Sequence, residues 1–213
     1  SAGVPTAGGT SAFNPILITN GNKGYYFSMT AKVEKPFAKG FYASVAYTKS
    51  MAGNLHDGGG DQPQSAWQGT ATVNGANTSP LGYTDYVLPD RVVALVSYRK
   101  EYLKHLATTV SLVYNGGISG RFSYVYGGSP STSAPNVSGD INRDGVIGND
   151  LIYIPTKADL STMQFLSQTV NGVVYDQTAQ RSLFENYIQQ DKYLRAHRGQ
   201  YAERNGAQVP WLN

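Results

Sequence analysis

The chain has 213 residues, of which 40% are hydrophobic and only 15% are charged. Charge is scarcer than the roughly 25% of an average soluble domain, and a net charge of +3 is too small and too scattered to indicate a nucleic-acid partner. The chain has no cysteine and no run of about 18 apolar residues, which excludes a disulfide framework and a helical membrane span.

Strict alternation of apolar and polar side chains predicts a first pair of β-strands, over residues 24–35 and 41–49. One face of the first strand carries Tyr25, Phe27, Met29, Ala31 and Val33, and the other carries Tyr26, Ser28, Thr30, Lys32 and Glu34. The second strand repeats this with Phe41, Ala43, Val45 and Tyr47 on one face. The short link at residues 36–40 predicts a hairpin with one face suited to lipid and one to water.

A second pair of strands is predicted over residues 90–100 and 105–116, joined by the short link 100–104. Their apolar faces carry Val92, Ala94, Val96 and Tyr98, then Leu106, Val110, Leu112 and Tyr114. Two long polar segments, residues 50–89 and 117–208, follow the two pairs, where a soluble domain would use a few residues. Short links alternating with long loops are typical of outer-membrane barrels.

Each strand has roughly 10 residues, enough to cross a hydrocarbon core when tilted. Many of the 16 tyrosines fall near the strand ends, which favours interfacial aromatic girdles, although tyrosine is common in strands of any kind. The sequence therefore predicts an all-β fold: a partial transmembrane antiparallel β-barrel of four full strands, plus the start of a fifth at residues 209–213. Four strands cannot close a barrel, so we expect the chain to be a fragment of one barrel domain.

The second loop is expected to contain helix. Apolar residues at helical spacing predict one helix over residues 178–198, with Asp176 or Thr178 as N-cap and Gly199 as C-cap. A shorter helix is expected near residues 160–168. A tight turn is expected at Arg204, Asn205 and Gly206.

One acidic segment predicts a calcium site. Asp140, Asn142 and Asp144 occupy positions one, three and five of an EF-hand-type loop, Gly145 occupies position six, and Val146 offers a carbonyl at position seven. Position twelve, normally Glu, is Leu151, and the nearest carboxylate, Asp150, comes one residue early. The alternative is a turn rich in Asp, Asn and Gly that binds no metal.

Aromatic residues of the loops are candidates for stacking on a ligand, or for packing within the loops themselves. They are Trp67, Tyr83, Tyr86, Phe122, Tyr124 and Tyr126. No catalytic pattern is present: His56, His105 and His197 lack zinc-site spacing, and neither a phosphate-binding loop nor a nucleophile elbow occurs. We therefore expect no enzymatic activity.

Four runs of the sequence resemble the C-terminal barrel portion of TonB-dependent outer-membrane receptors, particularly the Oar-like branch of Bacteroidota. The runs are NGNKGYYFSMTAKVEKPFAKGFYASVAYTKS, DYVLPDRVVALVSYRKEYLKHLATTVSLVYNGGISGRFSYVYGG, GDINRDGVIGNDLIYIP and YIQQDKYLRAHRGQYAERNGAQVPW. The resemblance covers nearly the whole chain from about Asn20. Residues 149–155 and 202–206 are its most specific parts.

This resemblance implies a barrel of about 22 strands with a plugged lumen, in the outer membrane of a Gram-negative bacterium. The implied function is ligand import through a TonB-dependent receptor, to which this chain supplies late barrel strands and extracellular loops. The implied partners are the remainder of the barrel and its plug domain, the TonB system through that plug, and a surface lipoprotein or another outer-membrane protein. Two alternatives stay open: an adhesive or structural barrel whose loops bind a partner protein, and a soluble calcium-stabilised β-sandwich.

Overall fold

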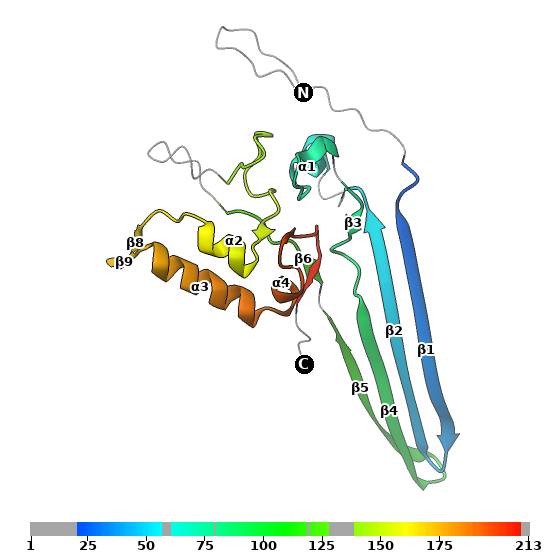
Figure 1. The fold of residues 1–213 in the computed structure, drawn as a ribbon. Coiled ribbons are helices and arrows are strands. Elements are labelled where there is room, and N and C mark those ends of the chain that lie inside the picture. Colours follow the sequence, from blue (N-terminus) through cyan, green and yellow to red (C-terminus); the bar gives the residue numbers. More distant parts are fainter. Residues whose placement is uncertain (1–20, 57–60, 79, 119, 128–138, 210–213) are drawn as a thin grey trace.

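The computed structural model describes residues 21–56, 61–78, 80–118, 120–127 and 139–209. These residues form mostly β-structure in antiparallel sheets, which confirms the coarse prediction of an all-β chain. In Figure 1 the long strands extend away from a group of helices and short strands beside one end of the sheet. Within those ranges, no helix is both long enough and apolar enough to cross a lipid bilayer.

Four long strands form the main sheet, in the order β1-β2-β4-β5 (Figure 1). They are β1 (Tyr25–Ala38), β2 (Phe41–Asn54), β4 (Asp90–Leu103) and β5 (Leu106–Gly117), and the short strand β3 (Gly82–Tyr83) pairs with the end of β2. All four long strands were predicted from the alternation. The observed strands extend past the predicted ends, most of all β2, which continues to Asn54.

The predicted links at residues 36–40 and 100–104 were wrong in length, because each hairpin turn has only two residues. In the first turn Lys39 and Gly40 have φ values of 52° and 77°, as the tightest hairpin turns require. Pro36 lies inside β1, where the register shifts between Lys35 and Ala38. An edge strand with a bulge tolerates proline because the missing N–H has no partner to lose.

The described residues beyond the main sheet form helices and three two-stranded sheets. The helices are α1 (Pro63–Gln68), η1 (Ala76–Thr78), α2 (Lys157–Thr162), α3 (Gln177–Gln190) and α4 (Lys192–Ala196). The paired strands are β6 (Arg121–Phe122) with β11 (Ala207–Gln208), β7 (Tyr153–Ile154) with β10 (Gln200–Tyr201), and β8 (Gln168–Val170) with β9 (Val173–Tyr175). The fifth long strand expected at residues 209–213 lies, beyond Val209, outside the described ranges.

The single helix predicted over residues 178–198 is wrong, because the helix breaks at Asp191. Asp176 caps α3 as expected by accepting from the N–H of Ala179 at 2.7 Å. Asp191 adopts an extended conformation, and its side chain accepts from the N–H of Leu194 at 2.8 Å. A side-chain acceptor that serves the backbone in this way starts a new helix.

One small core joins the two long insertions. It consists of Ala71, Leu151, Ile154, Ile188, Leu194 and Ala202. Ala71 belongs to the first insertion and the others to the second. Beside this core the N–H of Thr72 donates to the carbonyl of Asn149 at 2.8 Å, and the N–H of Leu151 donates to Thr72 at 2.9 Å. The two insertions therefore fold as one unit, which we call the loop unit.

Arg204 fastens the loop unit to the end of β2. Its side chain is buried, with 2% of the residue exposed, and its guanidinium donates to the carbonyls of Leu55 (2.9 Å), Asn54 and Pro80 (3.5 Å). A Cβ atom at Gly82 would lie only 2.5 Å from the Nε atom of Arg204. Glycine at position 82 therefore leaves the space that this arginine fills.

Arg204→Met is expected to lower the free energy of unfolding of this junction by about 3 kcal/mol, because three carbonyl oxygens lose the charged donor that a buried arginine supplies. Hydrogen exchange at the amides of Tyr83 and Thr84 would measure the change. Arg195→Met is the control: this arginine of α4 also donates to a carbonyl, that of Gln189 at 2.8 Å, but it is exposed, so its loss should cost less than about 1 kcal/mol. Equal effects of the two variants would contradict the role assigned to Arg204.

Candidate functional site

The register of the main sheet places the apolar side chains of all four long strands on one face. Ala31 lies opposite Tyr47 and Tyr47 opposite Val92, and Val96 lies opposite Leu112. We call this surface the apolar face. It comprises Tyr25, Phe27, Met29, Ala31, Val33, Phe41, Ala43, Val45, Tyr47, Val92, Ala94, Val96, Tyr98, Leu106, Val110, Leu112 and Tyr114.

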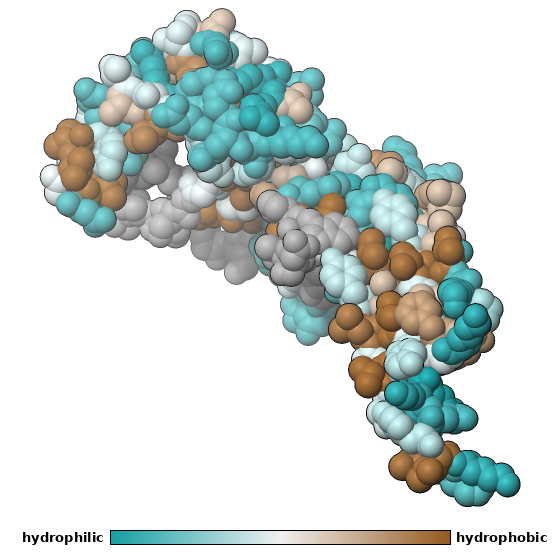
Figure 2. Space-filling model, turned by 90° about the horizontal axis from the view of Figure 1, so that it is seen from below, coloured by the Kyte–Doolittle hydropathy of each residue, from teal (hydrophilic) through white to brown (hydrophobic). Residues whose placement is uncertain are grey.

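The apolar face is exposed rather than packed. Val33 is 77% exposed and Leu112 is 72% exposed, and Figure 2 shows hydrophobic side chains gathered along the strands. Soluble monomers rarely expose a contiguous apolar surface of this extent. This face is therefore suited to apolar surroundings that the described chain does not itself supply.

The opposite face of the sheet is polar. Cross-strand hydrogen bonds join Ser28 to Ser50 (3.1 Å), Thr30 to Thr48 (2.9 Å), Ser97 to Ser111 (2.8 Å) and Arg91 to Asn115 (3.1 Å). Ion pairs on the same face join Lys32 to Glu34, and Arg99 to Glu101 at 3.0 Å. Val93, Leu95 and Val113 share this face, so it is mixed rather than uniformly polar. Its hydroxyl and charged groups suit contact with water.

Both edges of the main sheet are open. In the part of the chain that the structure describes, β1 pairs only with β2, and β5 pairs only with β4. Each outer strand therefore presents a row of backbone N–H and C=O groups without a partner strand. Such edges accept further strands.

The two ends of the apolar face differ in charge. At the loop-unit end, Lys49 and Asp90 form an ion pair at 2.8 Å, and the Tyr47 hydroxyl donates to the same carboxylate. At the hairpin end, the Lys35 ammonium lies 5.1 Å from the centre of the Phe41 ring, and the Lys100 ammonium lies beside an aromatic ring in the same way. Charge and aromatic rings thus mark both borders of the face.

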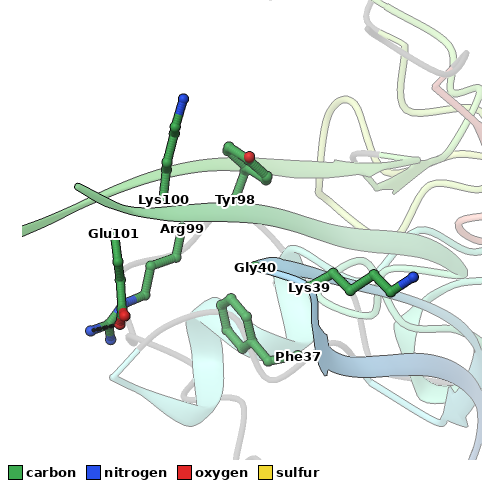
Figure 3. A pocket seen from close by; sticks show the side chains of 7 residues that line it. All are labelled: Phe37, Lys39, Gly40, Tyr98, Arg99, Lys100 and Glu101. Atoms are coloured by element: carbon green, nitrogen blue, oxygen red, sulfur yellow. Dashed lines mark hydrogen bonds and ion pairs between the residues drawn. The ribbon is translucent and has the colours of Figure 1, made fainter. Parts of the chain in front are cut away.

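A shallow pocket lies at the hairpin end, where β4 extends past the start of β2 (Figure 3). It is lined by Phe37, Lys39, Gly40, Tyr98, Arg99, Lys100 and Glu101. Figure 3 shows Tyr98 and Lys100 on one side of β4, and Arg99 and Glu101 on the other. The polar groups do not converge on a common point, so the pocket suggests no catalytic arrangement.

The predicted calcium loop folds around its own acceptor oxygens. The Asp140 carboxylate accepts from the N–H groups of Asp144 (3.1 Å) and Gly145 (3.2 Å). The Asn142 side chain also accepts from the N–H of Asp144, at 2.9 Å. Asp144 in turn accepts from the N–H of Val146 at 2.9 Å. Four of the five predicted site residues are thus held in one tight loop, with Gly145 at a φ of 87°.

Asp150, the fifth predicted residue, is 2% exposed and reaches back to the start of the loop. Its carboxylate accepts from the N–H groups of Ile141 and Asn142 and from the Asn142 side chain. The pKa of this carboxyl is raised above its usual value. Burial is the main cause, the charges of Asp144 and Asp140 add to it, and the two backbone hydrogen bonds only partly oppose it. Across the described ranges, no three His, Cys, Asp or Glu side chains gather closely enough to hold a metal by themselves.

Five of the six predicted ligand-stacking residues make contacts within the chain. Trp67 donates from its indole to Asn77 at 2.9 Å, and Tyr83 lies under the guanidinium of Arg121 at 4.0 Å. The Tyr126 hydroxyl accepts from the N–H of Tyr153 at 3.2 Å.

Phe122 and Tyr124 form the remaining pair, with ring centres 5.1 Å apart. The Tyr124 hydroxyl donates to Asp191 at 2.8 Å, and burial together with this bond raises the pKa of Tyr124 far above its usual value. Tyr86 is 69% exposed. The six rings therefore do not line one common surface, and their binding of a ligand stays a prediction.

Two buried polar residues have no local pattern that predicts their burial. Arg204 was expected only in a turn, and Asn149 was noted only as part of a family-like run, yet Asn149 is 3% exposed beside the carboxylate loop. The histidines lie apart: His56 bonds Thr70 at 3.0 Å and His197 stacks on the Tyr193 ring.

Comparison with known proteins adds no family assignment. No protein-family model, no curated protein and no solved structure matches the chain.

Proposed function

We propose that this chain is a segment of an outer-membrane β-barrel of the TonB-dependent receptor type, supplying barrel strands and extracellular loops for ligand import. The observation that carries the proposal is the apolar face: the four long strands direct most of their apolar side chains to one exposed side, and the hydrogen-bonded polar side chains lie on the other. Lipid outside and water inside a barrel require this division. The receptor type rests on the sequence resemblance.

The length of the apolar face supports a membrane crossing. On β4 the face lies between Asp90 and Lys100. Ten steps of about 3.4 Å give about 34 Å along the strand, or about 24 Å across the membrane at a tilt of about 45°. The apolar band of outer-membrane barrels is about 25 Å tall. The borders of this face therefore match the thickness of the lipid that it would meet.

The open edges support a larger barrel. An unpaired edge inside lipid leaves backbone groups unsatisfied, so β1 and β5 would need neighbouring strands. The position of β11 fits this need: β11 pairs antiparallel with β6, which follows β5 in the chain, and the N–H of Val209 donates to the carbonyl of Gly120 at 3.2 Å. A strand continuing from this point would run back along the sheet.

The structure favours the barrel over the soluble β-sandwich, because a sandwich needs a second sheet over the apolar face, and none of the described segments covers it. The adhesive barrel remains the second candidate. The β8–β9 hairpin favours it, since this hairpin exposes Val170, Val173 and Val174 at the far end of the loop unit (Figure 1). Exposed apolar tips of this kind can dock a partner protein.

Topology labelling in intact cells tests the barrel proposal, because the chain has no native cysteine. Gln64→Cys in α1 and Asn186→Cys in α3 should react with a membrane-impermeant maleimide, since long loops face the exterior. Lys104→Cys, in the turn after β4, should react only after the cells are broken. Labelling of Lys104→Cys in intact cells, with Gln64→Cys protected, would contradict this orientation. Uptake of a ligand by cells carrying the complete barrel would separate import from adhesion.

A further inference from the structure

We infer that the loop from Asp140 to Asp150 binds one calcium ion, which stabilises the contact between the two long insertions. The structure places oxygen atoms of three side chains, Asp140, Asn142 and Asp144, along one sharp turn. Positive φ values at Arg143 (60°) and Gly145 (87°) produce this turn. This inference goes beyond the barrel proposal and does not depend on it.

An independent observation next to the loop points to a cation. Asn149 is 3% exposed, and its amide nitrogen donates to the Asp144 carboxylate at 3.2 Å. The Oδ1 atom of the same amide is buried and has no hydrogen-bond partner. A buried acceptor without a donor is costly. A bound cation would satisfy this oxygen.

The geometry of the Asn149 amide allows that contact. Its oxygen and nitrogen exchange places when the amide turns over, which would bring Oδ1 next to an Asp144 carboxylate oxygen. Two acceptor oxygens are stable at that separation when a cation lies between them. The amide therefore donates to Asp144 without the ion and becomes a ligand with it.

The donor types favour calcium over other metals. All donors are hard oxygens from carboxylates, amides and a carbonyl, and no sulfur or imidazole lies among them. Asp150 is engaged by Ile141 and Asn142 and shapes the loop instead of completing the ligand set. With two carboxylates on the ion, water would fill the remaining positions. The affinity should resemble that of extracellular calcium modules, with Kd about 10⁻⁴–10⁻³ M.

The position of the loop assigns a role to the ion. The carbonyl of Asn149 accepts from the N–H of Thr72 at 2.8 Å, and a Cβ atom on Gly75 would lie 3.5 Å from the Asp144 Cβ. Thr72 and Gly75 belong to the first insertion, whereas the loop belongs to the second. Calcium would fix the loop that carries these contacts and so hold the loop unit together.

The test is calcium titration of the whole 213-residue chain by calorimetry, followed by hydrogen exchange with and without calcium. Asp144→Asn keeps the acceptor for Val146 but removes a charge, and should weaken binding at least about tenfold, because ligand charge sets affinity. Asn149→Asp adds a charged ligand and should tighten binding. Asp176→Asn, at the α3 cap, is the matched control, since Asn caps helices as well as Asp. Calcium should slow exchange at Thr72 and Leu151.

Three results would overturn the inference: no calcium binding up to about 10 mM, which exceeds the range of such sites; the same affinity in Asp144→Asn as in the unaltered chain; or equal affinity for magnesium and calcium. Asn149→Asp keeps the test valid if Asp144→Asn fails to fold. Weaker calcium binding by a folded Asn149→Asp chain would also count against the site.

Discussion

Ala31→Arg is expected to destabilise the assembled barrel by about 2–4 kcal/mol, the cost of an arginine on the lipid face near the bilayer midplane. Ala31 is one of the apolar-face residues of β1 and lies opposite Tyr47 on β2. Within its row of the sheet Ala31 has Tyr47 and Val92 as neighbours, so an arginine there has no carboxylate directly opposite; the Lys49–Asp90 ion pair lies in the next row, beside Met29. The measurement is denaturant unfolding of the complete barrel in lipid vesicles.

Thr30→Arg is the matched control, because it introduces the same side chain at the neighbouring residue of the same strand. Thr30 lies on the polar face, where its hydroxyl bonds Thr48 at 2.9 Å. The loss of one exposed hydrogen bond should cost about 1 kcal/mol or less. Equal destabilisation by the two arginines would remove the distinction between a lipid face and a water face, and the barrel proposal with it.

The long strands were predictable because their signal is local. Alternation along one strand shows which side chains share a face, and the tight link at Lys39 and Gly40 forces β1 and β2 to pair. The sequence could not show that the strands continue as far as Asn54 and Leu103. Gly53 and Asn54 look like loop residues, and they belong to a strand because β3 pairs with both and Tyr25 of β1 pairs with Gly53.

The loop unit was predictable only in part, because its stability comes from contacts between distant residues. Ala71 packs with residues of the second insertion, and no local pattern reveals that pairing. Arg204 bonds carbonyls about 150 positions earlier in the chain. The β8–β9 hairpin did carry a local signal that was missed: Asn171-Gly172, with φ values of 50° and 80°, is a strong two-residue turn.

The candidate calcium loop and the candidate ligand-stacking residues were also predictable only in part. The spacing of Asp140, Asn142 and Asp144 predicted a loop with oxygens turned inward, because short polar side chains bond the backbone two to five residues ahead. Asn149 and Asp150 could not be placed from spacing, since their positions depend on the bridge to Thr72. The sequence did not decide whether the six aromatic residues stack on a ligand or pack within the loops. In the structure, five of the six rings have partners within the chain.

Ile188→Ala is expected to produce the second large effect, a loss of about 2–5 kcal/mol in the stability of the loop unit. Ile188 lies on α3 with none of its surface exposed, and it packs in the core that Ala71 and Leu194 share. Truncation leaves a cavity that surrounding backbone can fill only in part. Hydrogen exchange at the amides of Leu151 and Ala202 should accelerate together, because both residues border this core.

Leu183→Ala on the same helix is the control for Ile188→Ala. Leu183 is 53% exposed, so its removal creates no enclosed cavity and should cost less than about 1 kcal/mol. The informative comparison is the amide of Thr72, which belongs to the first insertion and is hydrogen-bonded to Asn149. If the insertions share one core, Ile188→Ala speeds exchange at Thr72 as well as at Ala202. Acceleration confined to the second insertion would mean that the two insertions are stabilised separately and that the loop unit is not one cooperative body.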